Sequence, residues 1–152
     1  MLITHAPFNE ELAHVPEEAT RGDLLLKRLD ELLDDEDLLE RVRADLARRY
    51  RLTTLHGRHS TPVEVILRLF VLKQLFNWGF EQTEKQVRNS PLLQWFCRIT
   101  VERVPDDTTL LRWVQLIQPE TRQEIVERAL SVYSSSKRSR KTQTKSKIPK
   151  KI

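Results

Sequence analysis

Cysteine is almost absent from this chain of 152 residues, because Cys97 is its only thiol. A single cysteine excludes an internal disulfide framework and is typical of a protein kept in a reducing compartment. The opening residues, MLITHAPFNEE, lack both the cationic start and the apolar run of a signal peptide. These absences favour a cytoplasmic protein.

The ligand spacing of a zinc site is absent as well. His56 and His59 lie close together in a segment that contains a glycine, but the one cysteine, Cys97, follows them far along the chain. Structural zinc sites place their histidines and cysteines at short, regular spacings that these residues do not match. We therefore expect no metal site.

Acidic residues are missing from the C-terminal end, where Glu127 is the last one. Residues 137–152 hold eight cations, so the chain's net charge of +4 leaves −4 for the rest. A segment of serine, threonine, lysine and arginine with so few hydrophobic residues cannot form a core, and we expect disorder over residues 134–152. Cations on such a tail attract any DNA duplex. The candidate DNA contacts here are Lys137, Arg138, Arg140 and Lys141.

No stretch is apolar for long enough to cross a membrane. The most apolar one, residues 61–77 (TPVEVILRLFVLKQLFN), is interrupted by Glu64, Arg68 and Lys73. Glu64 and Arg68 lie nearly opposite Lys73 on a helical projection, so the helix has no continuous polar stripe. Because such a helix must be buried, we expect it to be the central helix of a soluble all-α domain.

Start and stop signals flank this central helix. Pro62 suits the first helical position, because the amide hydrogen that proline lacks would have no partner there. Thr61 precedes it and Glu64 follows three residues after Thr61, a spacing that predicts a capping box. Gly79 is expected to close the helix.

Helical periodicity continues on both sides of the central helix. Two helices are expected before it, one capped by Asp23 and one beginning in the acidic junction 34–37. Three short helices are expected between Phe80 and Ile117, and a last one over Pro119–Tyr133. The predicted organisation is an irregular arm at residues 1–22, a compact multi-helix all-α domain at residues 23–133, and the basic tail at residues 134–152.

The third of the short helices begins with Asp106 and Asp107, either of which can cap it. Two short helices followed by a capped third are the order of elements in a helix-turn-helix, whose last helix presents its first turns to the major groove. Thr108, Thr109 and Arg112 occupy those turns. They are the candidate base contacts.

A basic block lies before and within the central helix. Residues 41–75 contain eight cations and two acids, whereas residues 1–40 contain 12 acids and three cations. Such a block is a solvated helix face or a set of phosphate contacts, which arginine makes through its planar fork of donors. Both interpretations stay open. The candidate phosphate contacts are Arg48, Arg49, Arg51 and Arg58.

Four short motifs follow one another between residues 57 and 113. They are a Gly-Arg pair, a Pro-x-Glu-x-x-Leu-Arg opening of an apolar helix, a Trp-Phe-Cys, and a Pro-Asp-x-Thr-Thr-Leu-x-Arg-Trp. The residues are Gly57, Arg58, Pro62, Glu64, Leu67, Arg68, Trp95, Phe96, Cys97, Pro105, Asp106, Thr108, Thr109, Leu110, Arg112 and Trp113. Their order and spacing resemble the N-terminal domain of insertion-sequence transposases of the DDE class, the InsH-like group.

The resemblance implies recognition of double-stranded DNA, at the terminal inverted repeats of a mobile element, near the nucleoid of a prokaryotic cell. Such transposases transfer strands with a separate RNase H-like domain, in which three carboxylates hold two divalent cations such as Mg²⁺. Because no acid follows Glu127, we expect that catalytic domain to be missing and this chain to be neither an enzyme nor a cofactor carrier. Two other interpretations stay open: a helical module that holds transposase subunits together, and a non-functional remnant.

Overall fold

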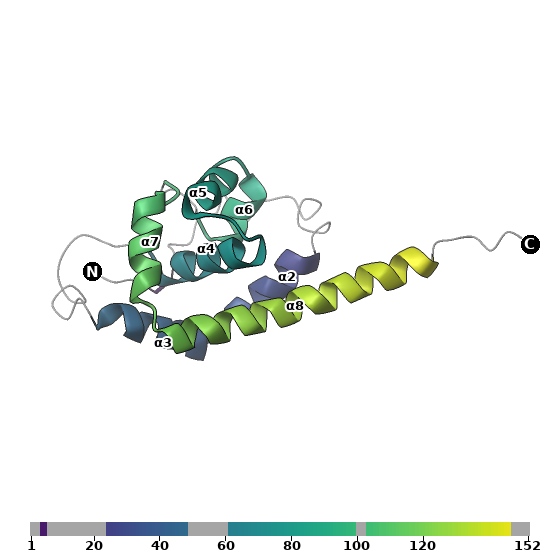
Figure 1. The fold of residues 1–152 in the computed structure, drawn as a ribbon, viewed down its shortest axis with the longest axis horizontal. Coiled ribbons are helices and arrows are strands. Elements are labelled where there is room, and N and C mark those ends of the chain that lie inside the picture. The colour runs from purple at the N-terminus through teal and green to yellow at the C-terminus, as the bar shows by residue number, and fades with distance from the viewer. Residues whose placement is uncertain (1–3, 6–23, 49–60, 100–102, 147–152) are drawn as a thin grey trace, which may run out of the picture.

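A computed structural model describes residues 4–5, 24–48, 61–99 and 103–146, with the side chains of residues 138–146 outside the description (Figure 1). Within this part of the chain there are seven helices and no strand, which confirms the all-α class predicted from the sequence. The helices are α2 (Leu24–Leu33), α3 (Glu36–Ala47), α4 (Val63–Leu75), α5 (Phe80–Arg88), α6 (Pro91–Phe96), α7 (Asp107–Leu116) and α8 (Pro119–Ser146).

Helix α4 lies at the centre of the fold. All of its residues from Val63 to Leu72 are buried, and it contacts α2, α3, α5, α7 and α8. Figure 1 shows α5 and α6 on one side of α4, α2 and α8 on the other, and α7 across one end. The predicted central helix is therefore confirmed, since neighbouring helices cover an element that has no polar stripe.

The start of α4 differs from the predicted capping box. Its N-cap is Pro62, whose side chain makes no capping hydrogen bond, and the helix proper begins one residue later. The amide of Glu64 donates to the carbonyl oxygen of Thr4 at 3.0 Å. The Glu64 carboxylate lies 2.8 Å from His5 Nδ1, which raises the pKa of that histidine. A contact distant in sequence therefore replaces the local Thr61–Glu64 pair.

The end of α4 also differs from the prediction, because Gly79 does not close it. The residue in the left-handed conformation is Asn77, with φ of 53°, and the amide of Trp78 donates back to the Lys73 carbonyl at 3.0 Å. Asparagine tolerates this conformation better than most residues, so Asn77 ends the helix directly after the C-cap Phe76. Gly79 is instead the N-cap of α5.

Arg68 joins three parts of the core from the middle of α4. Its side chain is 1% exposed and donates to Asp30 of α2 at 2.5 Å and to the carbonyl oxygen of Phe96 in α6 at 3.0 Å. Arg98, which adopts a left-handed conformation after α6, pairs with the same Asp30 at 3.0 Å. A buried guanidinium needs such partners, because an unpaired charge in the interior is strongly destabilising.

Helix α8 continues well beyond the predicted end of the domain. It runs to Ser146, so the segment expected to be disordered from residue 134 is helical as far as that residue. Ile125, Ala129 and Ser136 of α8 are buried, and α8 packs on α2 and α4. From residue 120 to 146 the chain has no proline or glycine, and its lysine, arginine and glutamine residues favour a helix once packing has started it.

Ion pairs fix α8 against α3. Arg128 donates to Asp35, the N-cap of α3, at 3.0 Å, and Arg41 of α3 pairs with Glu124. Arg128 also lies 2.7 Å from Glu124. These bonds lower the pKa of both carboxyl groups, so the pairs hold α3 and α8 together while the carboxylates are ionised.

Two further predictions fall partly or wholly outside the described residues. The irregular arm at residues 1–22 is described only at Thr4 and His5, and the expected cap Asp23 is not described.

Among the helices that the structure describes, none combines the length and apolar character needed to cross a membrane.

Candidate nucleic-acid interface

Carboxylates occupy the N-terminal end of α7. Asp106 is the N-cap and accepts from the Thr109 amide at 2.7 Å, while Asp107 accepts from the Thr108 amide at 2.8 Å. The amide of Asp107 donates to Glu84 of α5 at 3.1 Å. Hydrogen bonds from Thr109, with help from the charge of Arg112, lower the pKa of Asp106, which keeps the cap ionised.

The tip of α7 is therefore closed to anions. A helix N-terminus binds phosphate through free amide groups and a positive field. Here the amides of Asp107, Thr108 and Thr109 already donate to carboxylates. Three negative side chains surround them, so a DNA phosphate at this end would meet repulsion. If α7 meets DNA, it does so with its side and not with its tip.

One side of α7 is exposed and chemically suited to base edges. Thr108, Leu111, Arg112 and Gln115 are exposed, and their spacing of three, four and seven residues places them on one face. Arginine pairs with guanine, glutamine pairs with adenine, and threonine or leucine methyl groups contact the methyl group of thymine. The opposite side holds Leu110 and Val114 in the core. A helix with this division can be anchored on one side and read DNA with the other.

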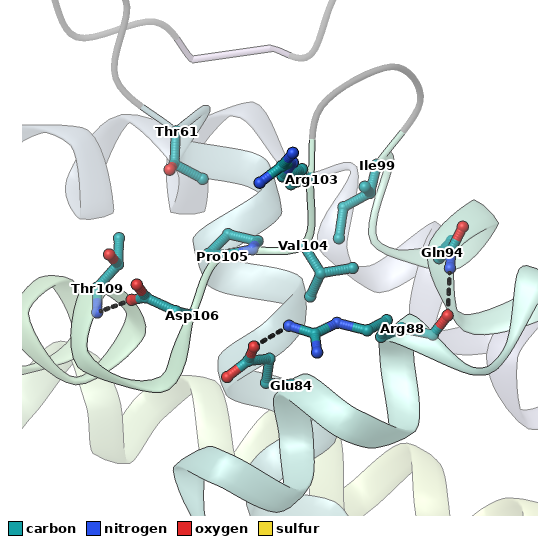
Figure 2. A pocket seen from close by; sticks show the side chains of 10 residues that line it. All are labelled: Thr61, Glu84, Arg88, Gln94, Ile99, Arg103, Val104, Pro105, Asp106 and Thr109. Atoms are coloured by element: carbon teal, nitrogen blue, oxygen red, sulfur yellow. Dashed lines mark hydrogen bonds and ion pairs between the residues drawn. The ribbon is translucent and has the colours of Figure 1, made fainter.

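A cleft of about 830 Å³ lies beside the start of α7 (Figure 2). Figure 2 shows Thr61 and Arg103 on one side of the 104–106 segment and Glu84 with Arg88 on the other. Glu84 pairs with Arg88 and also holds α7, while the Gln94 side chain donates to the Arg88 carbonyl at 2.9 Å. Most of these polar groups are hydrogen-bonded or paired with one another. The bond from the Asp107 amide to Glu84 holds the first residue of α7 against α5.

A second cleft, of about 500 Å³, lies beside the exposed face of α7, between α7 and the first turns of α8. Leu111 and Gln115 of α7 line it together with Gln123 and Glu127 of α8. Phe70, Lys73 and Phe80 form part of its floor and wall, and the Lys73 ammonium lies 4.5 Å from the Phe80 ring centre. The exposed face of α7 and the exposed face of α8 therefore border one continuous hollow.

The predicted phosphate contacts of the basic block are only partly described. Arg48 is exposed at the C-cap of α3, whereas Arg49, Arg51 and Arg58 lie outside the described residues. Whether these arginines gather with Arg112 on one face stays a prediction.

The predicted contacts of the tail lie on the last part of α8. Lys137 is exposed and sits 4.7 Å from the centre of the Tyr133 ring. Arg138, Arg140 and Lys141 belong to the same helix, with side chains outside the description. Figure 1 places this end of α8 far from α7 along the long axis of the molecule.

Most residues of the four sequence motifs have structural roles. Leu67, Phe96, Cys97 and Leu110 are buried, and Arg68 is the buried ion-pair centre. Burial raises the pKa of the Cys97 thiol, which keeps it neutral and unreactive. Two motif residues, Thr108 and Arg112, remain exposed on α7. Asp106, at the N-cap of α7, is exposed as well.

Sequence reasoning missed Leu111 and Gln115 as members of the candidate interface. Leu111 is an apolar residue of the kind that usually packs in a core, yet it is 37% exposed. The available signal was the spacing, since residues 108, 111, 112 and 115 form one helical row. Thr109, by contrast, is partly buried and faces the cleft of Figure 2.

The helix-turn-helix assignment stays a prediction. Helix α5 contacts both α6 and α7, as the first helix of a tri-helical unit would.

In the part of the chain that the structure describes, no group of three or more histidine, cysteine, aspartate or glutamate side chains is arranged to hold a metal ion.

Comparison with known families assigns the chain to a family. The sequence model of the family described as Transposase domain (DUF772) matches residues 12–116. The chain belongs to this transposase-domain family. The match ends at the last residue of α7, so α8 lies beyond it although it packs on α2 and α4. Searches of curated proteins and of solved structures found no match.

Proposed function

We propose that this transposase-family chain recognises the ends of an insertion sequence by laying the exposed side of α7 in the DNA major groove. Arg112 and Gln115 are the base-reading side chains, and Thr108 and Leu111 supply methyl contacts. The chain comes from a transposase of the DDE class, and it acts in the cytoplasm on double-stranded DNA. The observation that supports this most is the exposed face of α7 in a helix whose other side is locked in the core.

The electrostatics of α7 favour base reading over backbone clamping. Arg112 is exposed, whereas Arg41, Arg68, Arg88, Arg98 and Arg128 are held in ion pairs with carboxylates. An arginine that is already paired gives up a partner before it binds phosphate. The charge of Arg112 acts on Asp106, but the hydrogen bonds that Asp106 accepts come from Thr109 and not from Arg112. Its guanidinium is thus available for a guanine edge.

A second candidate function is subunit assembly, and one observation favours it. Leu111, Phe76 and Leu130 are exposed large hydrophobic side chains, and Leu111 lines the cleft between α7 and α8. Exposed apolar side chains beside a cleft suit a partner helix as well as DNA. If α7 serves assembly, Leu111→Ser weakens self-association and leaves DNA affinity unchanged.

The test of DNA recognition is a competition titration with two duplexes. One carries the terminal inverted repeat of the element that encodes the chain, and the other is a shuffled duplex of the same composition and length. We expect a preference of at least about tenfold for the element end, since specific sites exceed random DNA by larger factors in complete recognition domains. Equal affinity for both duplexes at two salt concentrations would leave only non-specific attraction by cations and would remove the proposal.

A further inference from the structure

We propose that α8 is a rigid arm that carries its C-terminal cations to the phosphate backbone of the same duplex that α7 reads, within one helical turn of DNA from the base contacts. This inference rests on the proposed function, because the duplex is placed by α7. It adds a second contact region and a fixed spacing between the two regions.

A single row of residues on α8 leads from α7 to the basic end. Gln123 and Glu127 border the cleft that Leu111 and Gln115 of α7 also line. Steps of three or four residues, which keep to one face of a helix, continue the row. Its members are Gln123, Glu127, Leu130, Ser134, Lys137, Lys141 and Lys145, and those as far as Lys137 are exposed. The row therefore begins at the α7 interface and ends among lysines.

The cations of the last part of α8 share that face. Residues 137–146 contain five cations and no acid. At 3.6 residues per turn, their positions fall within an arc of about 160°. On the same projection, the positions of Lys137, Arg138, Lys141 and Lys145 lie about 80° or more from those of the buried residues Ile125, Ala129 and Ser136, whereas Arg140 lies beside them. The five cations are Lys137, Arg138, Arg140, Lys141 and Lys145.

Helix geometry sets the spacing. From Gln123, beside α7, the axis of α8 rises about 21 Å to Lys137 and about 33 Å to Lys145, at 1.5 Å per residue. Since a duplex rises about 3.4 Å per base pair along each strand, these distances correspond to about six to ten base pairs. Figure 1 agrees, because α7 and the end of α8 lie at opposite ends of the long axis.

The charges along α8 separate the two contact regions. Glu127, the last acid of the chain, lies in the row close to α7 and repels phosphate there. Beyond it, Leu130 and Ser134 are neutral and exposed. Favourable backbone contact therefore begins at Lys137. A flexible tail with the same cations would instead touch the duplex at variable positions.

Two matched variants test the rigid arm. Ser134→Pro removes an amide hydrogen and clashes with the preceding turn, so it breaks α8 while keeping every cation. Ser134→Ala keeps the helix at the same exposed position. Each full-length protein is bound to the element-end duplex and its contacts are mapped by hydroxyl-radical footprinting. Circular dichroism and urea denaturation check that both variants keep the folded body.

The wild-type protein and Ser134→Ala should protect two backbone patches separated by about six to ten base pairs, the spacing set by α8. Ser134→Pro should keep the patch at α7 and the preference for element ends, and lose the distal patch. Deleting residues 137–152 should remove the same distal patch, which covers the case in which the proline variant does not fold. A wild-type footprint of one patch, or a distal patch that survives Ser134→Pro, overturns the rigid arm alone. Loss of all preference for element ends in the wild type overturns the proposed function as well.

Discussion

At the scale of single residues, Arg68 of α4 connects three helices, because it bonds residues of both α2 and α6. Its guanidinium bonds Asp30 and the Phe96 carbonyl and lies 5.3 Å from the Phe96 ring centre. Arg68→Ala should lower the free energy of unfolding by about 3 to 5 kcal/mol, because it empties a buried site and breaks the bonds to Asp30 and to the Phe96 carbonyl. Arg98→Ala is the matched control, since Arg98 pairs with the same Asp30 but is 31% exposed and should cost about 1 kcal/mol or less. Urea denaturation measures both. Equal losses would show that burial of Arg68 is not what matters.

The carboxylates between α3 and α8 predict how stability depends on acid. Hydrogen bonds from Arg128 and from Arg41 lower the folded-state pKa of Asp35 and of Glu124, respectively. A lowered folded pKa stabilises the fold above the unfolded pKa, about 4 for these groups, and this stabilisation is lost as pH falls through the folded values. Urea midpoints should therefore drop below about pH 4. Asp35→Asn keeps a capping side chain and should show a flatter acid limb; an identical acid limb would contradict the role of the pair.

At the scale of elements, α4 is the central buried helix, and substitutions in it should lower stability the most. Leu69 and Phe70 are 1% and 2% exposed, so truncating them leaves cavities. Leu69→Ala or Phe70→Ala should each cost about 2 to 5 kcal/mol. Leu130→Ala, at a site 45% exposed on α8, should change stability by less than about 0.5 kcal/mol. Similar denaturation midpoints for all three variants would show that α4 is not the central helix.

How well the elements could be predicted depended on how local their signals are. The cap at Asp106 and the burial of α4 followed from nearby residues, because caps and helical periodicity are local. The start of α4 and the end of α8 did not. Thr4 reaches Glu64 across a long stretch of chain, and α2 supports α8 by packing. Tertiary contacts of this kind leave no pattern in a short window of sequence.

The candidate site was predictable to a similar extent. Thr108 and Arg112 are exposed on α7, as a reading helix requires, and the family assignment agrees with the motifs that contain them. The pairs of Arg41 with Glu124 and of Arg128 with Asp35 could not be read from the sequence, because each depends on where another helix lies. Arg88 instead pairs with Glu84 one turn earlier in α5. Exposure of Leu111 and Gln115 likewise depends on how far α8 covers α7. A count of arginines therefore overstates how many are available for phosphate.

For the whole molecule, the proposal separates recognition from chemistry. Incubated with Mg²⁺ or Mn²⁺ and element-end DNA, the purified 152-residue chain should neither nick nor join strands, because its described residues hold no group of three or more metal-ligating side chains. Denaturing gels of end-labelled duplex measure cleavage and joining. The control is a nuclease-sensitive supercoiled plasmid treated with the same preparation. Metal-dependent cutting at element ends by nuclease-free protein would contradict the expectation.

The central claim is that the exposed side of α7 reads the element end. Arg112→Ala and Lys27→Ala each remove one exposed cation, but Lys27 lies on α2, away from α7. Both variants are titrated in competition with element-end and shuffled duplexes at two salt concentrations. Arg112→Ala should reduce the preference for the element end by about 1 to 3 kcal/mol, the cost of losing one base contact. Lys27→Ala should leave that preference unchanged. An unchanged preference in Arg112→Ala would contradict the account and would remove α7 as the reading helix.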